Sequence, residues 1–305
     1  MKEICLGTVQ FGLNYGINNK TGKPDKEEVF DILNYSLEMG ITILDTAAAY
    51  GNAEELIGEY IRTHKKESSL KVITKLRPNL FEEPRLDSEE IKRTIKREVT
   101  ESLKKLNIKT LHGLLLHTPS DYYIEDVLEA LGEIKTEGLS ENIGVSIYDK
   151  QTALDVVSNS LMDFIQVPYN VFDQRLDEEE FFSLAHKNKI KIFTRSIFLQ
   201  GLLLIETLDL PKHLQEAKSY LLQYRNICAK YSITTQEAAI QFIKESPQHN
   251  NIVLGIDNMK QLAEDVELFQ KDALNTDLIK ELKETFNNKV AKAIIVPSLW
   301  AKKEK

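Results

Sequence analysis

Cysteine is scarce in this chain. Among its 305 residues only Cys5 and Cys228 are cysteines, and neither belongs to a CxxC pair or to a pattern of metal-ligand spacing. A disulfide framework is therefore excluded. The first residues also lack a charged segment followed by an apolar run, which is the pattern of a secretory signal. We expect the protein to act in the cytoplasm.

Basic charge and long apolar runs are lacking as well. The formal net charge is -8, so no excess of lysine and arginine is available to neutralise nucleic-acid phosphates or an anionic membrane surface. No stretch approaches the roughly 18 consecutive apolar residues that a membrane-spanning helix needs. We therefore expect neither a nucleic acid nor a membrane as a partner.

The sequence does contain enough apolar material for one large core. Hydrophobic residues make up 42% of the chain and charged residues 28%, which is typical of a globular protein. Length alone would suggest two domains. Barrels of alternating strands and helices reach this length around a single core, so one domain over residues 1–305 is the prediction.

Short apolar segments of strand length recur along the chain, and most are followed by a segment with the 3.6-residue period of a helix. Asp25 with Glu28, and Thr234 with Glu237, have the spacing of a capping box at a helix start. Gly40 and Gly138 stand where helices should end. The eight predicted strands are Glu3–Val9, Ile41–Asp45, Lys71–Lys75, Leu111–His117, Ile143–Ser146, Phe164–Val167, Lys189–Thr194 and Asn251–Gly255.

Strict alternation of strand and helix predicts parallel strands joined by crossover helices, and eight such units predict an α/β fold, the closed (β/α)8 TIM barrel. The alternative is a doubly wound open sheet. The segment Leu6–Gly12 lacks the GxGxxG spacing of a dinucleotide-binding turn, which disfavours that alternative. Two regions extend the simple barrel: a loop and helical insertion at about 195–250, with helices near 214–230 and 234–244, and a C-terminal segment at about 271–305.

Ionisable side chains end three successive predicted strands. Asp45 ends the second, Lys75 the third and His117 the fourth. In a barrel of this kind, polar residues at the carboxyl ends of strands point into the active site. Tyr50 follows Asp45 through a loop of small residues, which allows its phenol to fold back over the same end. We therefore predict that these four residues meet.

Together the four groups suit the reduction of a carbonyl. A phenol has a pKa of about 10 and is a poor acid at neutral pH unless a cation favours its phenolate. Lys75 supplies a cation, and Asp45 is the partner that a partly buried ammonium needs. His117 can hydrogen-bond the substrate oxygen. We expect the set to polarise a carbonyl and protonate its oxygen as hydride reaches the carbon.

Each residue taken alone has a plainer interpretation. Asp45 would be a turn or helix cap, Tyr50 a half-buried aromatic residue, Lys75 a surface residue and His117 a core histidine. The joint occurrence of all four makes these interpretations much weaker. His112 and His117 lie an odd number of residues apart on one predicted strand, so they face opposite sides and cannot share a metal. We predict no metal site.

The segment from Gly40 to Glu54 has the sequence GITILDTAAAYGNAE, and it resembles the signature of the aldo-keto reductase family. Further segments match in family order: Leu6–Thr8, Ile73–Lys75, Leu114–His117, Ile143–Ser146, Gln166–Asn170 and Gly201–Leu203. The resemblance implies a TIM barrel without a Rossmann domain, NADPH or NADH bound at the carboxyl face, and direct hydride transfer without a metal. It also implies that Tyr50 is the general acid, that Lys75 and Asp45 adjust its acidity, and that His117 orients the carbonyl.

The same resemblance implies a set of cofactor contacts. Ser146 and Gln166 match positions that hydrogen-bond the nicotinamide carboxamide, while Ile147 stands where the family often has Asn. Arg195 stands where many relatives stack an aromatic residue on the nicotinamide, and the segment from Arg195 to Gly201 should wrap the pyrophosphate. The implied cofactor-binding residues are Gly7, Thr8, Asp45, Ser146, Gln166, Arg195, Ser196, Phe198, Gln200, Gly201, Gly255, Asp257, Asn258, Gln261 and Asp265.

Asp257 bears on the choice of cofactor. NADPH-preferring relatives often have Arg or Lys in this stretch, because a 2′-phosphate calls for charge-assisted hydrogen bonds. An aspartate would repel that phosphate and accept a hydrogen bond from a ribose hydroxyl, which favours NADH. The alternative interpretation of Asp257 is a helix N-cap, and Lys260 lies one turn away. The sequence leaves both cofactors open, with NADPH slightly ahead because of the family's usual preference.

Two other functions remain as alternatives. One is a barrel lyase in which Lys75 forms a Schiff base with a carbonyl substrate. The other is a non-catalytic barrel that binds the cofactor only. We expect a small-molecule carbonyl or alcohol as the reaction partner, with sugars and other small aldehydes or ketones as the substrate class. The loop after Thr194 and the C-terminal segment should decide the substrate, since loops vary freely on this fold.

Overall fold

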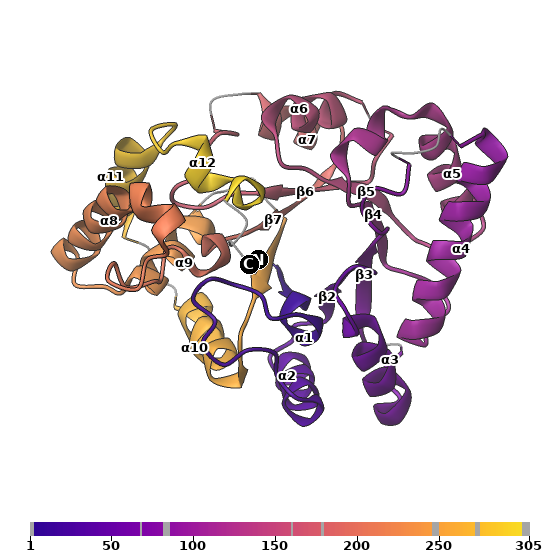
Figure 1. The fold of residues 1–305 in the computed structure, drawn as a ribbon, viewed down its shortest axis with the longest axis horizontal. Helices are drawn as coiled ribbons and strands as arrows, with labels where there is room; N and C mark the ends of the chain where they lie inside the picture. Colours follow the sequence, from indigo (N-terminus) through magenta and orange to yellow (C-terminus); the bar gives the residue numbers. More distant parts are fainter. Residues whose placement is uncertain are drawn as a thin grey trace.

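Eight parallel strands form a closed barrel in which each strand pairs with its neighbours in chain order and β8 pairs with β1 (Figure 1). The computed structural model describes residues 3–67, 69–81, 86–159, 161–177, 180–245, 250–271 and 275–300. The predicted TIM barrel is confirmed, and the doubly wound sheet is wrong. The strands are β1 (Glu3–Gly7), β2 (Ile43–Asp45), β3 (Lys71–Lys75), β4 (Gly113–Leu116), β5 (Ile143–Ser146), β6 (Phe164–Pro168), β7 (Lys191–Arg195) and β8 (Asn251–Gly255).

Helices surround the barrel (Figure 1). The α-helices are α1 (Val9–Gly12), α2 (Lys26–Glu38), α3 (Ala53–His64), α4 (Ser88–Leu106), α5 (Glu125–Thr136), α6 (Lys150–Ser158), α7 (Phe181–Lys187), α8 (Lys218–Lys230), α9 (Thr235–Glu245), α10 (Met259–Gln270), α11 (Thr276–Phe286) and α12 (Lys292–Ile295). The described residues also form the 3-10 helices η1 (Pro119–Tyr123), η2 (Leu199–Gly201), η3 (Lys212–Ala217) and η4 (Pro297–Leu299). None of the helices that the structure describes is both long and apolar enough to cross a bilayer.

Several predicted strands begin too early, because their first apolar residue belongs to the end of the preceding helix. Ile41 donates its backbone N–H to Ser36 O after Gly40, whose φ is 76°. Ile190 likewise donates its backbone N–H to Ala185 O, after Lys189, whose backbone is in the left-handed region. In this helix-ending motif an apolar residue packs back on the helix. Strands β2 and β7 therefore start two residues later than predicted.

The predicted ends of β1 and β4 also shift. Strand β1 stops at Gly7 because Thr8 turns the chain, donating both its N–H and its hydroxyl to Asp45 O at 2.9 and 3.0 Å. Val9 then begins α1. Leu111 pairs with Ser140 only through an isolated bridge, so β4 begins at Gly113, and His117 lies one residue beyond the end of that strand.

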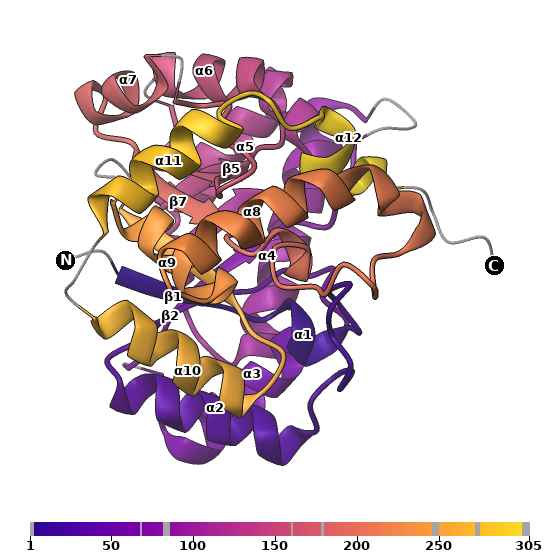
Figure 2. The ribbon, with the colours of Figure 1, turned by 90° about the vertical axis from the view of Figure 1, so that its left-hand side faces the viewer.

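The predicted insertion after β7 contains η2, η3, α8 and α9. Thr234 caps α9 by accepting the N–H of Glu237 at 3.1 Å. Helices α8, α9 and α11 lie together on one side of the barrel (Figure 2). Residues 246–249 of the insertion, and residues 272–274 and 301–305 of the C-terminal segment, lie outside the described residues.

The barrel interior is filled by a cluster of apolar side chains that includes Cys5, Ile73, Leu115, Phe164 and Phe193. Phe164 occupies the space beside Gly113 and Gly144, where an added Cβ would meet its ring. A filled interior leaves the carboxyl ends of the strands as the place where polar side chains can meet.

Two glycines on outer helices give a test of this packing. Gly58 on α3 lies so close to α4 that an added Cβ would overlap the carbonyl oxygen of Lys105, whereas Gly132 on α5 has nothing within 4 Å of that position. We expect Gly58→Ala to lower the free energy of unfolding by about 1–3 kcal/mol through overpacking. The matched Gly132→Ala should raise it by up to about 1 kcal/mol through helix propensity. Urea titration measures both, and equal effects of the two substitutions would contradict the packing described.

Candidate active site

A buried ion pair joins the ends of two neighbouring strands. The Lys75 ammonium lies 2.8 and 2.7 Å from the two Asp45 carboxylate oxygens and donates a further bond to Thr46 O at 2.9 Å. The side chains of Lys75 and Asp45 are only 2% and 6% exposed. Burial alone would lower the pKa of Lys75, but Asp45 and Tyr50 more than reverse this and raise it to about 12. Lys75 is therefore a cation throughout the neutral range.

Tyr50 lies beside this ion pair. Its hydroxyl accepts a bond from Lys75 Nζ at 3.3 Å, and the ammonium lies 4.9 Å from the centre of its ring. The loop that carries Tyr50 packs directly on the end of α1. An added Cβ on Gly12 would overlap Tyr50 O, and one on Gly51 would overlap Gly12 O. Two glycines thus let the loop approach closely enough to bring the phenol to Lys75.

The acidity of Tyr50 differs from the sequence expectation. Burial raises the pKa of Tyr50, and the Lys75 cation lowers it again only in part, so the net shift is upward from 10. The expected cation is present, but the desolvation of the phenol outweighs it. Tyr50 is consequently protonated at neutral pH, and its hydroxyl is available as a proton donor.

His117 faces Tyr50 across the cavity. The two ring centres are 6.1 Å apart and the ring planes lie at 85° to one another. Burial, with help from Lys75 and Arg195, lowers the pKa of His117 to about 4, so the imidazole is neutral at pH 7. Its Nδ1 is buried and has no hydrogen-bond partner among the described residues.

His112 lies apart from this group. Its Nδ1 lies 2.7 Å from a Glu141 oxygen, and its side chain lines a different cavity together with Lys71 and Lys191, which begin β3 and β7. The described residues contain no cluster of three or more His, Cys, Asp or Glu side chains suited to a metal ion.

One amide side chain and one hydroxyl side chain complete the floor of the site. Gln166, on β6, donates from Nε2 to Asp45 Oδ1 at 2.7 Å. Ser146, at the end of β5, donates to Gln166 Oε1 at 3.3 Å. The ion pair is thereby linked to the strands across the barrel.

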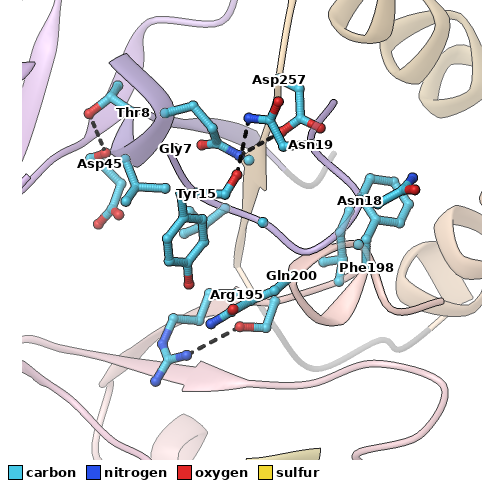
Figure 3. A pocket seen from close by; sticks show the side chains of 18 of the residues that line it. Gly7, Thr8, Tyr15, Asn18, Asn19, Asp45, Arg195, Phe198, Gln200 and Asp257 are labelled. Carbon is cyan, nitrogen blue, oxygen red and sulfur yellow. Dashed lines mark hydrogen bonds between the residues drawn. The ribbon is translucent and has the colours of Figure 1, made fainter. Parts of the chain in front are cut away.

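These groups line one cavity of about 420 Å³ at the carboxyl ends of the strands (Figure 3). All four predicted catalytic residues line it. So do most of the predicted cofactor positions, namely Gly7, Thr8, Asp45, Ser146, Gln166, Arg195, Ser196, Phe198, Gln200, Gly201, Gly255, Asp257 and Gln261. The structure therefore brings together residues that lie on eight different strand ends and loops.

Two predicted cofactor positions do not line the cavity. Asn258 is the N-cap of α10 and accepts the N–H of Gln261 at 2.9 Å. Asp265 is completely buried, and one of its oxygens accepts a bond from Gln236 at 2.8 Å. Since Asn258 is the cap, the alternative interpretation of Asp257 as the N-cap is wrong. The Asp257 carboxylate instead accepts a bond from Gln10 at 3.3 Å and faces the cavity.

The segment after β7 turns back over the cavity through residues with unusual backbone angles. Ser196, Leu199, Gln200 and Gly201 all have φ between 49° and 89°. Such angles are strained for residues other than glycine and cluster at functional sites. Asn170 holds this turn in place by donating from Nδ2 to Ser196 O at 3.0 Å.

Several residues that line the cavity were not predicted from the sequence, among them Gln10, Tyr15, Tyr148, Gln236 and Glu264. Tyr148 had a usable signal, because side chains alternate along a strand and Ser146 and Tyr148 fall on the same face. Ile147, between them, is 1% exposed and packs in the core. Tyr15 stands in a loop without periodicity, and only the folded structure reveals its position.

Asp265 provides a test that depends on burial. Its burial, partly opposed by the bond from Gln236, raises its pKa to about 7. A carboxyl with a raised folded-state pKa contributes stability at acid pH that is lost as the pH rises from about 4 to about 7. Asp265→Asn has no carboxyl to ionise at this position, so it should not lose this stability. Between pH 4 and pH 7 we expect the free energy of unfolding of the variant to rise by up to about 4 kcal/mol relative to that of the wild type.

Urea denaturation across this pH range measures the difference. Asp31→Asn, which changes an exposed carboxyl on α2, is the matched control and should follow the wild type. Parallel wild-type and Asp265→Asn profiles would show that Asp265 ionises normally.

Comparison with known proteins agrees with this geometry. A model of the Aldo/keto reductase family matches residues 3–286. The chain is 24% identical to the uncharacterized oxidoreductase YqkF of Bacillus subtilis, covering 96% of this chain and 99% of that protein. It is also 24% identical to the NADH-specific methylglyoxal reductase of Escherichia coli, covering 93% and 99% respectively.

A solved structure shows the same fold. The holo form of aldo-keto reductase AKR11C1 from Bacillus halodurans superposes with a TM-score of 0.75 at 21% identity, covering 96% of this chain and 95% of that one. The family model spans nearly the whole chain, and the full-length relatives match the barrel from end to end. The chain therefore belongs to the aldo-keto reductase family and is an NAD(P)H-dependent oxidoreductase that reduces carbonyl compounds.

Proposed function

We propose that the protein reduces a small aldehyde or ketone to an alcohol with NADH, using Tyr50 as the general acid. The observation that supports this most is the arrangement of Asp45, Lys75 and Tyr50 as one connected group that faces the neutral His117 in a single cavity. A carbonyl oxygen placed between the Tyr50 hydroxyl and the His117 ring would meet two neutral polar groups and one nearby cation.

Each residue has a defined part in this proposal. A dihydronicotinamide held in this cavity would supply the hydride for the carbonyl carbon. Tyr50 donates the proton of its hydroxyl to the oxygen, and the adjacent Lys75 cation stabilises the phenolate that remains until solvent restores the proton. His117 supplies a hydrogen bond that positions the oxygen, because its neutral ring carries one N–H and one acceptor nitrogen.

The cavity fits a dinucleotide in several respects. The Ser146 hydroxyl and the Gln166 amide lie together on the floor, where both are able to bind a carboxamide. The turn at Ser196–Gly201, which contains left-handed residues, lines the cavity, and turns that alternate in this way form concave sites for phosphate oxygens. Gln10 Oε1 is buried without a partner among the described residues. By the family resemblance, these segments would hold the nicotinamide and the pyrophosphate.

The two alternative functions are disfavoured by the same geometry. A Schiff-base lyase needs the neutral amine of Lys75 as its nucleophile. Here the Lys75 amine is an ammonium with a pKa of about 12, held by both oxygens of Asp45. A barrel that only bound the cofactor would have no need for Tyr50 and His117 beside that ion pair.

The charges at the other end of the cavity favour NADH over NADPH. Asp257 and Glu264 line that end, while Lys75 and Arg195 are the only lysine or arginine among the described lining residues. Lys260 does not line the cavity; its side chain is 86% exposed and lies 3.7 Å from Glu264. Asp257, with no lysine or arginine among the described lining residues at this end, would repel a 2′-phosphate. A ribose hydroxyl could instead donate to Asp257.

The Tyr50→Phe substitution tests the proposed proton donor. Tyr50→Phe should lower kcat for carbonyl reduction by about a hundredfold or more, because general acids contribute at least that factor. NADH binding, followed by fluorescence quenching, should change little, since the hydroxyl acts in the transition state. Tyr123→Phe removes an exposed phenol hydroxyl outside the cavity and is the control. Wild-type turnover by Tyr50→Phe would show that another group supplies the proton.

The Asp257→Ala substitution tests the proposed choice of cofactor. Asp257→Ala should raise the ratio of kcat/KM for NADPH to that for NADH by about tenfold. This factor corresponds to about 1.4 kcal/mol, within the range for unit charges about 4 Å apart near a protein surface. Asp31→Ala removes an acid from the exposed face of α2 as a control. An unchanged ratio in Asp257→Ala would mean that this carboxylate does not face the ribose.

A further inference from the structure

One guanidinium in the cavity lacks an anionic partner. Arg195 donates to Ser196 Oγ at 3.2 Å and to Ile147 O at 3.0 Å, and both acceptors are neutral. Its guanidinium lies 4.4 Å from the centre of the Tyr148 ring. No ion pair of Arg195 occurs among the described residues. A guanidinium has five donors and binds carboxylates and phosphates through paired hydrogen bonds.

The Arg195 guanidinium lies on the side of the cavity where the chemistry occurs. Its bond to Ile147 O fixes it beside the end of β5. Figure 3 shows the Tyr15 hydroxyl directed toward the Arg195 guanidinium. Its charge is close enough to contribute to the low pKa of His117. An anion bound by Arg195 would therefore lie near the reacting carbonyl.

The other groups around this space are also able to donate hydrogen bonds. Tyr15 and Tyr148 line the cavity beside Tyr50, and burial raises the pKa of Tyr15 to about 12, so its hydroxyl stays protonated. Asp45 is fully engaged with Lys75. Its charge is thus balanced, and Arg195 leaves one positive charge in excess at this end.

We propose that the preferred substrate is an aldehyde or ketone that carries an anionic group, a carboxylate or a phosphate, bound by Arg195 with Tyr15 and Tyr148. This inference rests on the proposed carbonyl reduction and names its substrate class. A neutral carbonyl compound would offer no anionic group to the Arg195 guanidinium. An anionic one would pair with it and hold the carbonyl next to Tyr50 and His117. Arg195 is then a specificity-determining residue, and Tyr50 alone transfers the proton.

The competing role for Arg195 is toward the cofactor, as the resemblance to family members with an aromatic residue at this position implies. The two roles differ in what an Arg195 variant would change. If Arg195 binds the cofactor, its substitution should change the affinity for NADH and should affect charged and neutral substrates equally. If Arg195 binds the substrate, its substitution should change the preference for charged over neutral substrates.

The experiment compares matched pairs of substrates that differ in charge. The carboxylate pair is 4-carboxybenzaldehyde and its neutral methyl ester, and the phosphate pair is glyceraldehyde 3-phosphate and glyceraldehyde. The ratio of kcat/KM for the charged over the neutral member is measured with saturating NADH. We expect the wild type to favour the charged member of at least one pair by about tenfold or more, the factor typical of a charge-assisted hydrogen bond. The pair that shows this preference identifies the anion.

Variants then assign the preference to Arg195. Arg195→Gln should lower the ratio by about tenfold or more, and Arg195→Lys should retain part of it because the charge remains. Lys280→Gln removes an exposed cation on α11, whose side chain is 74% exposed, and should keep the wild-type ratio. The dissociation constant of NADH is measured for each variant by fluorescence quenching.

Three results would overturn the proposal. The wild type would show no preference for the charged member of either pair, or Arg195→Gln would keep the preference, or it would weaken NADH binding without changing the ratio. These leave the proposed carbonyl reduction intact. Failure to reduce any of the four compounds with NADH or NADPH would instead count against the proposed function itself, and against this inference with it.

Discussion

The buried ion pair between Asp45 and Lys75 is the interaction on which the rest of the site depends. Two charges removed from water are stable only when each satisfies the other, and here Thr46 O and the Gln166 amide complete the arrangement. The pair fixes the ends of β2 and β3 relative to β6. It also places a permanent cation beside the buried Tyr50 phenol.

Charge is unevenly distributed along the cavity. Lys75 and Arg195 stand where hydride and proton transfer are proposed, and Asp257 and Glu264 stand at the opposite end. Figure 3 shows Asp257 beside Asn19 and well away from Asp45. The same uneven distribution supports both an unphosphorylated ribose at one end and an anionic substrate at the other. The NADH inference follows from the Asp257 carboxylate that faces the cavity, and the substrate inference from the Arg195 guanidinium, which has no anionic partner among the described residues.

The fold and the catalytic group could be predicted from the sequence because both have local signals. Strand–helix alternation predicts the barrel, and polar residues after apolar runs locate Asp45, Lys75 and His117. Strand starts were less predictable, since Ile41 and Ile190 look like strand residues but end the preceding helices. The net pKa of Tyr50 and the position of Tyr15 depend on burial and on a loop, which no local pattern encodes.

The contact between Gly12 and Gly51 has a consequence for how the site responds to a substrate. Backbone atoms of the end of α1 and of the Tyr50 loop meet where neither residue has a side chain, so the two segments pack directly on one another. The phenol is therefore already oriented before any substrate arrives. Little reorganisation of polar groups should accompany the reaction, which is the condition under which fixed dipoles and charges lower an activation barrier most.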